Sequence, residues 1–204
     1  MLCSRLLFLR SSIPVRAIHR ASPESDLWAR ADAYHNSFLL KADPVLDATQ
    51  HHTRELGKNA ATAAVSPAQG KFLHLLLRGL NAKRVLEVGS LGGYSAIWMA
   101  RALPDDGELV ALEISAVNAQ AIEENPNNTN HFVEAKRLVR SGGIIIVDNT
   151  GRKGYPADPG RTGPGVEGVR ALLSHIRDDD EVEAATIHTV GEKGFDGFTF
   201  AYRK

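Results

Sequence analysis

The stretch Arg84-Val-Leu-Glu-Val-Gly-Ser-Leu-Gly-Gly-Tyr-Ser-Ala96 decides the fold of this 204-residue chain. Its first five residues, Arg84 to Val88, form a short run with two β-branched valines, which predicts a strand. Glycines then interrupt the run, and an apolar, helix-like pattern resumes from Tyr94 to Leu103. A strand that turns through glycines into a helix can present backbone N–H groups to an anionic ligand, because the first N–H groups of a helix lack partners within it.

The next apolar run, Leu109 to Leu112, ends at Glu113. An acidic residue at the end of the second strand of such a sheet holds the ribose hydroxyls of a nucleoside ligand. The glycines are spaced as G-x-x-G-G, whereas dinucleotide sites favour G-x-G-x-x-G. Neither Tyr94 nor Tyr155 has a lysine four residues on, so the Tyr-x-x-x-Lys pair of short-chain dehydrogenases is absent. We therefore expect an adenosine-type cofactor and keep a nicotinamide (NAD)-dependent oxidoreductase as the alternative.

Four stretches, in this order along the chain, are distinctive when taken together. They are Val65-Ser-Pro-Ala-Gln-Gly-Lys-Phe-Leu-His-Leu-Leu76, Ala82-Lys-Arg-Val-Leu-Glu-Val-Gly-Ser-Leu-Gly-Gly-Tyr-Ser95, Ile144-Ile-Ile-Val-Asp-Asn149 and Thr189-Val-Gly-Glu-Lys-Gly-Phe-Asp-Gly-Phe198. From about Asp43 to the C-terminus the chain resembles the cation-dependent O-methyltransferases, the relatives of caffeoyl-CoA and catechol O-methyltransferase.

The resemblance implies methyl transfer from S-adenosyl-L-methionine to a hydroxyl of a small aromatic, catechol-like molecule. It also implies a divalent, Mg²⁺-like cation held by Asp148 and Asn149. In the family, Val65 lies in the loop above the cofactor and Ser95 contacts the cofactor carboxylate. The cofactor-binding residues that the resemblance implies are Val65, Glu87, Gly89, Ser90, Ser95 and Glu113.

The residues alone give a weaker argument for the metal site. Asp148 and Asn149 follow four consecutive β-branched residues, and open α/β sheets bind ligands at the carboxyl ends of their strands. Carboxylate and amide oxygens are hard ligands that suit Mg²⁺. The same two residue types also commonly begin a turn, so this interpretation stays open beside the metal site.

Alternating strand and helix patterns predict a doubly wound, Rossmann-like α/β sheet that ends in an antiparallel strand pair. The resemblance implies that this sheet is of the class I S-adenosylmethionine methyltransferase type. The expected helices are Asp26–Leu40, Pro44–Leu56, Ser66–Leu80, Tyr94–Leu103, Ala116–Asn125, His131–Val139 and Val166–Ile176. The expected strands are Arg84–Val88, Leu109–Leu112, Ile144–Val147 and the closing pair Val182–Val190 and Phe195–Tyr202.

The chain is too short between Glu113 and Ile144 for the complete sheet of the family. These residues suffice for two helices and no strand, so about forty residues, roughly two central β–α units, look excised at Asn125/Pro126. In the family that segment carries one metal-ligand aspartate and a lysine that helps to deprotonate the acceptor. No catalytic residue is therefore assigned, and a non-catalytic, cofactor-binding remnant is a second hypothesis. We expect the strands Arg84–Val88 and Ile144–Val147 to close up as direct parallel neighbours.

Composition limits the other classes of function. The chain is 43% hydrophobic, with 24 basic and 24 acidic residues and no basic stripe, which argues against nucleic acid as a partner. No apolar run has the length of a membrane span, so no membrane partner is expected. The single cysteine, Cys3, excludes an internal disulfide framework. The expected partner is a small aromatic hydroxyl substrate, and a homodimer is left open as the assembly.

Residues 1–22 differ from the remainder, which we expect to be a single domain over 23–204. The leader holds four arginines and four serines, and no acidic residue precedes Glu24. This composition is typical of a mitochondrial transit peptide. The longest apolar run, Leu6 to Leu9, is too short for a secretory signal. An unstructured extension of a cytoplasmic protein is the alternative.

Overall fold

The computed structural model describes residues 5–9, 23–55, 64–113 and 128–204. The expected helix Ala116–Asn125 and the join at Asn125/Pro126 lie outside these residues. The described helices are α1 (Pro23–Leu39), α2 (Pro44–Glu55), α4 (Pro67–Gly79), α5 (Tyr94–Ala100), α7 (Asn128–Leu138) and α8 (Pro164–Arg177), with a 3₁₀ segment, η1, over Arg152–Ala157.

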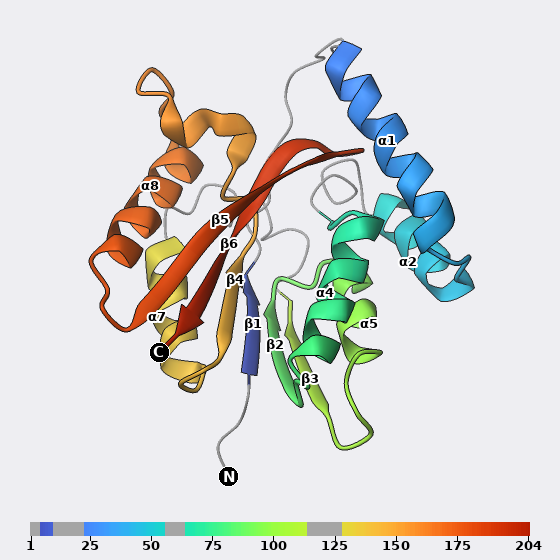
Figure 1. Ribbon diagram of the computed structural model, residues 1–204, viewed down its shortest axis with the longest axis horizontal. Coiled ribbons are helices and arrows are strands. Elements are labelled where there is room, and N and C mark those ends of the chain that lie inside the picture. The colour runs from blue at the N-terminus through green and yellow to red at the C-terminus, as the bar shows by residue number, and fades with distance from the viewer. Residues whose placement is uncertain (1–4, 10–22, 56–63, 114–127) are drawn as a thin grey trace.

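The strands form one six-stranded sheet in the order β3-β2-β1-β4-β6-β5 (Figure 1). Their bounds are β1 Arg5–Leu9, β2 Arg84–Val88, β3 Glu108–Leu112, β4 Ile144–Val147, β5 Val182–Gly191 and β6 Gly194–Arg203. The first four strands in this order, β3, β2, β1 and β4, run parallel to one another, while β6 is antiparallel to both β4 and β5. The predicted antiparallel closing pair is confirmed, and the parallel strands end at one common edge.

The expected closure of β2 against β4 is wrong. The strand β1, which comes from the predicted leader, lies between them and is parallel to both. It pairs with β2 from Arg5 opposite Arg84 to Leu9 opposite Val88, and its last three residues also pair with β4. An open slot would leave backbone N–H and C=O groups unpaired inside the sheet, at about 1–3 kcal/mol for each buried group. The targeting role of residues 1–22 stays a prediction.

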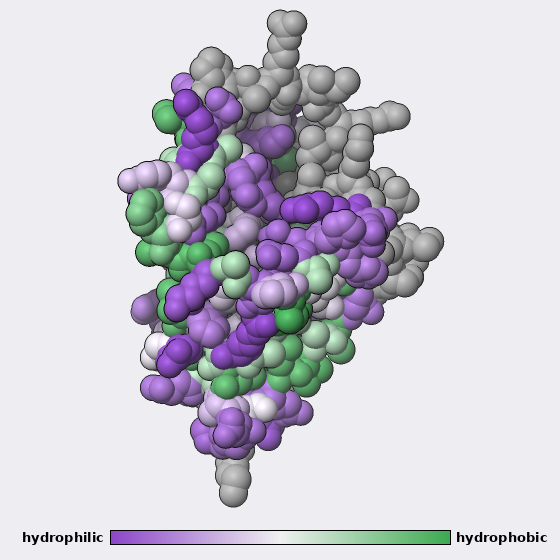
Figure 2. All heavy atoms as spheres, turned by 90° about the vertical axis from the view of Figure 1, so that its right-hand side faces the viewer, coloured by the Kyte–Doolittle hydropathy of each residue, from purple (hydrophilic) through white to green (hydrophobic). Residues whose placement is uncertain are grey.

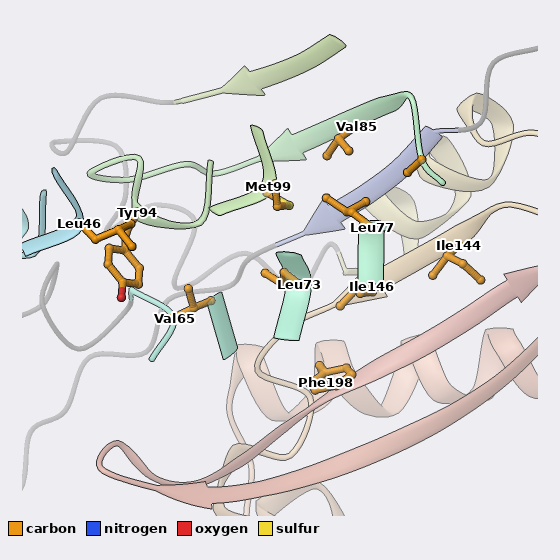
Figure 3. Packing of buried hydrophobic residues seen from close by; sticks show 11 residues of the cluster. Leu46, Val65, Leu73, Leu77, Val85, Tyr94, Met99, Ile144, Ile146 and Phe198 are labelled. Atoms are coloured by element: carbon orange, nitrogen blue, oxygen red, sulfur yellow. The ribbon is translucent and has the colours of Figure 1, made fainter. Parts of the chain in front are cut away.

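Helices cover both faces of the sheet, because successive side chains of β4 pack into two different helical clusters. Ile144 and Ile146 belong to a cluster with α4 and α5, whereas Ile145 and Val147 belong to a second cluster with α7 and α8. Figure 3 shows the first cluster, in which Leu73 and Leu77 of α4 point toward the sheet. The four residues of β4 are all buried, which is why this strand is apolar throughout rather than alternating.

Figure 2 views the molecule from the side on which α1 and α2 lie in Figure 1, and polar and apolar residues are interspersed over the described part of this face. The start of α4 is fixed by a capping box, in which the Ser66 hydroxyl accepts from the backbone N–H of Gln69 and the Gln69 side chain accepts from the backbone N–H of Ser66.

Within the described residues, no helix combines the length and the apolar character that crossing a bilayer requires.

We predict that Leu7→Pro destabilises the full chain. Proline removes a ladder N–H from a strand that has neighbours on both sides, so at least one backbone partner inside the sheet is left unpaired. We expect the free energy of unfolding to fall by about 1–3 kcal/mol or more. Urea melts would measure the fall against Leu7→Ile, which keeps the N–H; equal midpoints for the two variants would contradict the central position of β1.

Candidate cofactor and acceptor site

The glycine turn after β2 is held at the end of β3. The Gly89 N–H donates to the Leu112 carbonyl at 2.8 Å, and Gly89 has a φ of 86°, which a residue with a Cβ rarely adopts. Gly93, with a φ of 81°, begins α5. Gly92 lies against α2, since a Cβ at this position would come within 1.9 Å of Thr53 Oγ1. The turn therefore needs its glycines both for conformation and for close packing.

Glu113 lies beside this turn at the carboxyl end of β3. Its Oε2 accepts hydrogen bonds from the Leu91 N–H and, at 3.4 Å, from the Ser90 hydroxyl. Glu113 is exposed, so its carboxylate is accessible to a ligand. Two of the predicted cofactor residues, Ser90 and Glu113, are thus in contact although they are far apart in the sequence.

Glu87 and Ser95 form a second polar pair beneath the turn. Both are completely buried, and the Ser95 hydroxyl donates to Glu87 Oε1. A carboxylate inside a domain is stable only when it is hydrogen-bonded, so this pair fixes the first turn of α5 to β2. Val65 is 3% exposed and packs in the cluster with Leu73 and Tyr94 (Figure 3). The predicted cofactor residues therefore gather at the ends of β2 and β3.

Asp148 and Asn149 follow β4 at the same edge of the sheet. Asp148 is 6% exposed, and Asn149 has a left-handed φ of 58°. Among the described residues, no three His, Cys, Asp or Glu side chains come together as a metal-binding group. The structure thus supplies two adjacent oxygen donors for a cation.

A cavity of about 760 Å³ opens beside Asp148 and Asn149. Its walls come from α4, the loop after β4, the tip of the β5–β6 hairpin and Asp32 of α1. The aromatic residues that line it are Phe72, Phe195 and Phe198, and the charged ones are Asp32, Asp148, Lys153, Glu192, Lys193 and Asp196. A planar aromatic molecule with polar substituents suits such a cavity, because apolar walls take the ring and separate polar groups orient it.

Asp196 holds the loop that follows Asn149, and sequence reasoning assigned it no role. Its Oδ1 accepts from the N–H groups of Arg152 at 2.8 Å and Gly197 at 2.9 Å. Burial raises the pKa of the Asp196 carboxyl above its ordinary value, while these hydrogen bonds and the Arg152 guanidinium oppose the rise. The only sequence signal for Asp196 was its position within Phe195-Asp-Gly-Phe198, the end of the last family motif. This motif does not indicate which residues Asp196 contacts.

Comparisons with known proteins agree with this geometry. The O-methyltransferase family model matches residues 40–125. A catechol O-methyltransferase of Niastella koreensis is 32% identical over 221 residues, covering 88% of this chain and 99% of the relative. A catechol O-methyltransferase of Mycobacterium tuberculosis is 33% identical, covering 83% of this chain and 93% of the relative. The chain therefore belongs to the O-methyltransferase family.

Solved structures show the same fold. The O-methyltransferase TomG of Streptomyces achromogenes, in complex with SAM, superposes with a TM-score of 0.80 at 33% identity, over 90% of this chain and all of that one. An O-methyltransferase of Bacillus cereus, in complex with SAH, gives a TM-score of 0.79 at 30% identity, over 88% of this chain and 100% of that one. The fold is thus that of the class I S-adenosylmethionine methyltransferases, as predicted.

We predict that Gly151→Ala displaces the loop that carries Asn149. A Cβ on Gly151 would lie 2.4 Å from the Asp196 carbonyl carbon and 2.7 Å from the Gly197 nitrogen, and backbone atoms cannot rotate away as a side chain can. We expect a loss of about 1–3 kcal/mol in the free energy of unfolding. The control is Gly79→Ala at the end of α4, where a Cβ meets nothing within 4 Å. Denaturant melts should separate the two variants; similar losses would contradict the close approach.

Proposed function

We propose that this protein transfers a methyl group from S-adenosyl-L-methionine to a hydroxyl of a small, catechol-like aromatic molecule. One observation carries the proposal: the cofactor residues at the ends of β2 and β3 and the pair Asp148–Asn149 at the end of β4 share one edge of a parallel sheet. Ligands of open α/β sheets bind at this edge. The family membership favours methyl transfer over the nicotinamide alternative.

The cofactor would lie across the glycine turn. Glu113 would accept hydrogen bonds from the ribose hydroxyls, and the Ser90 hydroxyl and Leu91 N–H, which donate to its carboxylate, would hold it beside the turn. Glu87 and Ser95 would act from beneath, by keeping the turn in one conformation. The bound cofactor would supply an electrophilic methyl group to an oxygen of the acceptor.

The acceptor would occupy the cavity between α4 and the β5–β6 hairpin. Phe72 and Phe198 give it apolar walls, and their ring centroids lie 5.5 Å apart. A phenol has a pKa of about 10, so the neutral hydroxyl is a weak nucleophile that must lose its proton. Asp148 and Asn149 would hold a divalent cation near the hydroxyls. The positive charge of this cation would favour the phenolate form of the acceptor.

We also propose that two β–α units of the family are missing here. The alignment with the Niastella enzyme spans 221 positions, whereas 88% of 204 residues is about 180, so about forty positions have no counterpart. The family model also ends its match at residue 125, where sequence analysis placed the excision. This observation supports a second candidate function, a protein that binds the cofactor but turns over slowly because a metal ligand is absent.

We predict saturable binding of S-adenosylhomocysteine and none of NAD by calorimetry. Glu113→Ala should weaken the binding of S-adenosylhomocysteine about tenfold or more, since hydrogen bonds to a charged group contribute about 1.5–3 kcal/mol. Glu108→Ala is the control, because Glu108 is an exposed glutamate at the opposite end of the same strand. Saturable binding of NAD with no response to the methionine-derived ligand would reject the proposed cofactor.

We predict weak binding of Mg²⁺ to the protein without substrate. Two protein ligands leave most of the coordination shell to water, so we expect a Kd on the order of 1 mM that Asp148→Ala abolishes. Asp158→Ala, at an exposed loop position, is the matched control. Micromolar, substrate-free binding that survives Asp148→Ala would show that the cation binds elsewhere.

A further inference from the structure

Three consecutive residues of η1 adopt left-handed backbone conformations. Arg152, Lys153 and Gly154 have φ values of 42°, 57° and 78°. The first two carry a Cβ, and such conformations cost about 1–3 kcal/mol each, so they persist only where the surroundings impose them. This strained segment lines the acceptor cavity through Lys153.

The neighbours of Lys153 explain how the strain is imposed. The Arg152 N–H donates to Asp196. The side chain of Arg152 is buried against Gly165, where an added Cβ would come within 2.3 Å of the guanidinium. On the other side, Gly154 packs against the ring of Phe195. With Arg152 directed inward toward the start of α8, the next side chain, that of Lys153, borders the cavity.

Lys153 differs from Lys193, the second lysine of the cavity wall. Lys193 donates to the Ala64 carbonyl at 2.5 Å, and Asp32 accepts from the Glu192 N–H at 3.1 Å. In the described part of the chain, Lys153 takes part in no hydrogen bond or ion pair, although the wall also contains carboxylates. Its ammonium group is therefore available to a ligand.

The cavity wall contains a buried carboxylate and an exposed ammonium group. Asp148 is 6% exposed, whereas Lys153 is exposed, and three phenylalanines line the same cavity. A ligand that matches these groups has an aromatic ring that carries both hydroxyls and an anionic group. An ammonium group recognises a carboxylate through charge-assisted hydrogen bonds.

We propose that Lys153 binds a carboxylate of the acceptor, so that the substrates are catechol-like acids. The inference rests on the proposed function, since it assigns the anionic end of a molecule whose hydroxyls lie near Asp148. Asp32 and Glu192 on the same wall would repel an acid, and Lys153 would offset this repulsion together with Lys193, whose ammonium group donates to the Ala64 carbonyl.

Calorimetry on the full chain, saturated with S-adenosylhomocysteine and Mg²⁺, tests this specificity. The probes are 3,4-dihydroxybenzoate and 3,4-dihydroxybenzamide, which differ in charge and hardly in shape. We expect the acid to bind at least five times more tightly than the amide. Lys153→Met should reduce this ratio to about one, and Lys153→Arg should retain it. Lys41→Met, at an exposed lysine outside the cavity wall, is the matched control.

Two results would overturn the inference on its own: equal binding of acid and amide by the unmodified chain, or a preference that survives Lys153→Met. If the cofactor product binds but neither probe does, the proposed acceptor class is wrong and the assignment of Lys153 falls with it. Circular dichroism spectra of each variant verify that the fold is kept.

Discussion

The hydrogen-bond ladder of β1 is the constraint on which the rest of the structure depends. It joins β2 and β3 on one side to β4, β6 and β5 on the other. The predicted cofactor residues Glu87, Gly89 and Glu113 lie on the first half of the sheet, and Asp148, Asp196 and most of the cavity wall lie on the second. Since neighbouring strands are about 4.8 Å apart, one intervening strand sets the distance between the two halves of the site. Direct contact of β2 with β4 would bring them one strand spacing closer.

Each half of the site is rigid for a different physical reason. In the first half, the buried hydrogen bond from Ser95 to Glu87 and the packing of Gly92 against Thr53 fix the turn. In the second half, the Asp196 carboxylate fixes the loop after Asn149. It accepts a hydrogen bond from the N–H of Arg152, which lies 44 residues earlier in the chain. Strained backbone at Asn149 and Lys153 is tolerated there because the β5–β6 hairpin packs directly against the loop. Binding geometry thus depends on the closing hairpin as much as on the strand ends.

The relationship to known O-methyltransferases makes the absent segment informative. The chain retains the cofactor turn, the acidic residue after β3 and the Asp–Asn pair, while about forty positions of its relatives have no counterpart. The retained parts are those proposed to bind ligands, and the resemblance implies a further metal ligand in the absent part. Cofactor binding and methyl transfer therefore each need their own measurement.

The sequence by itself determined the strand–turn–helix unit around Gly89, the class of the fold, the antiparallel closing pair and the adjacency of Asp148 and Asn149. These depend on local patterns, because glycine spacing and the periodicity of apolar residues record the conformation and burial of a short segment. Only the tertiary structure decided that Arg5–Leu9 fills the centre of the sheet and that Asp196 supports the loop carrying Lys153. A run such as Leu6 to Leu9 has the same composition in a targeting leader as in a strand. Periodicity indicates that a residue is buried, but it does not indicate which residue from another part of the chain lies against it.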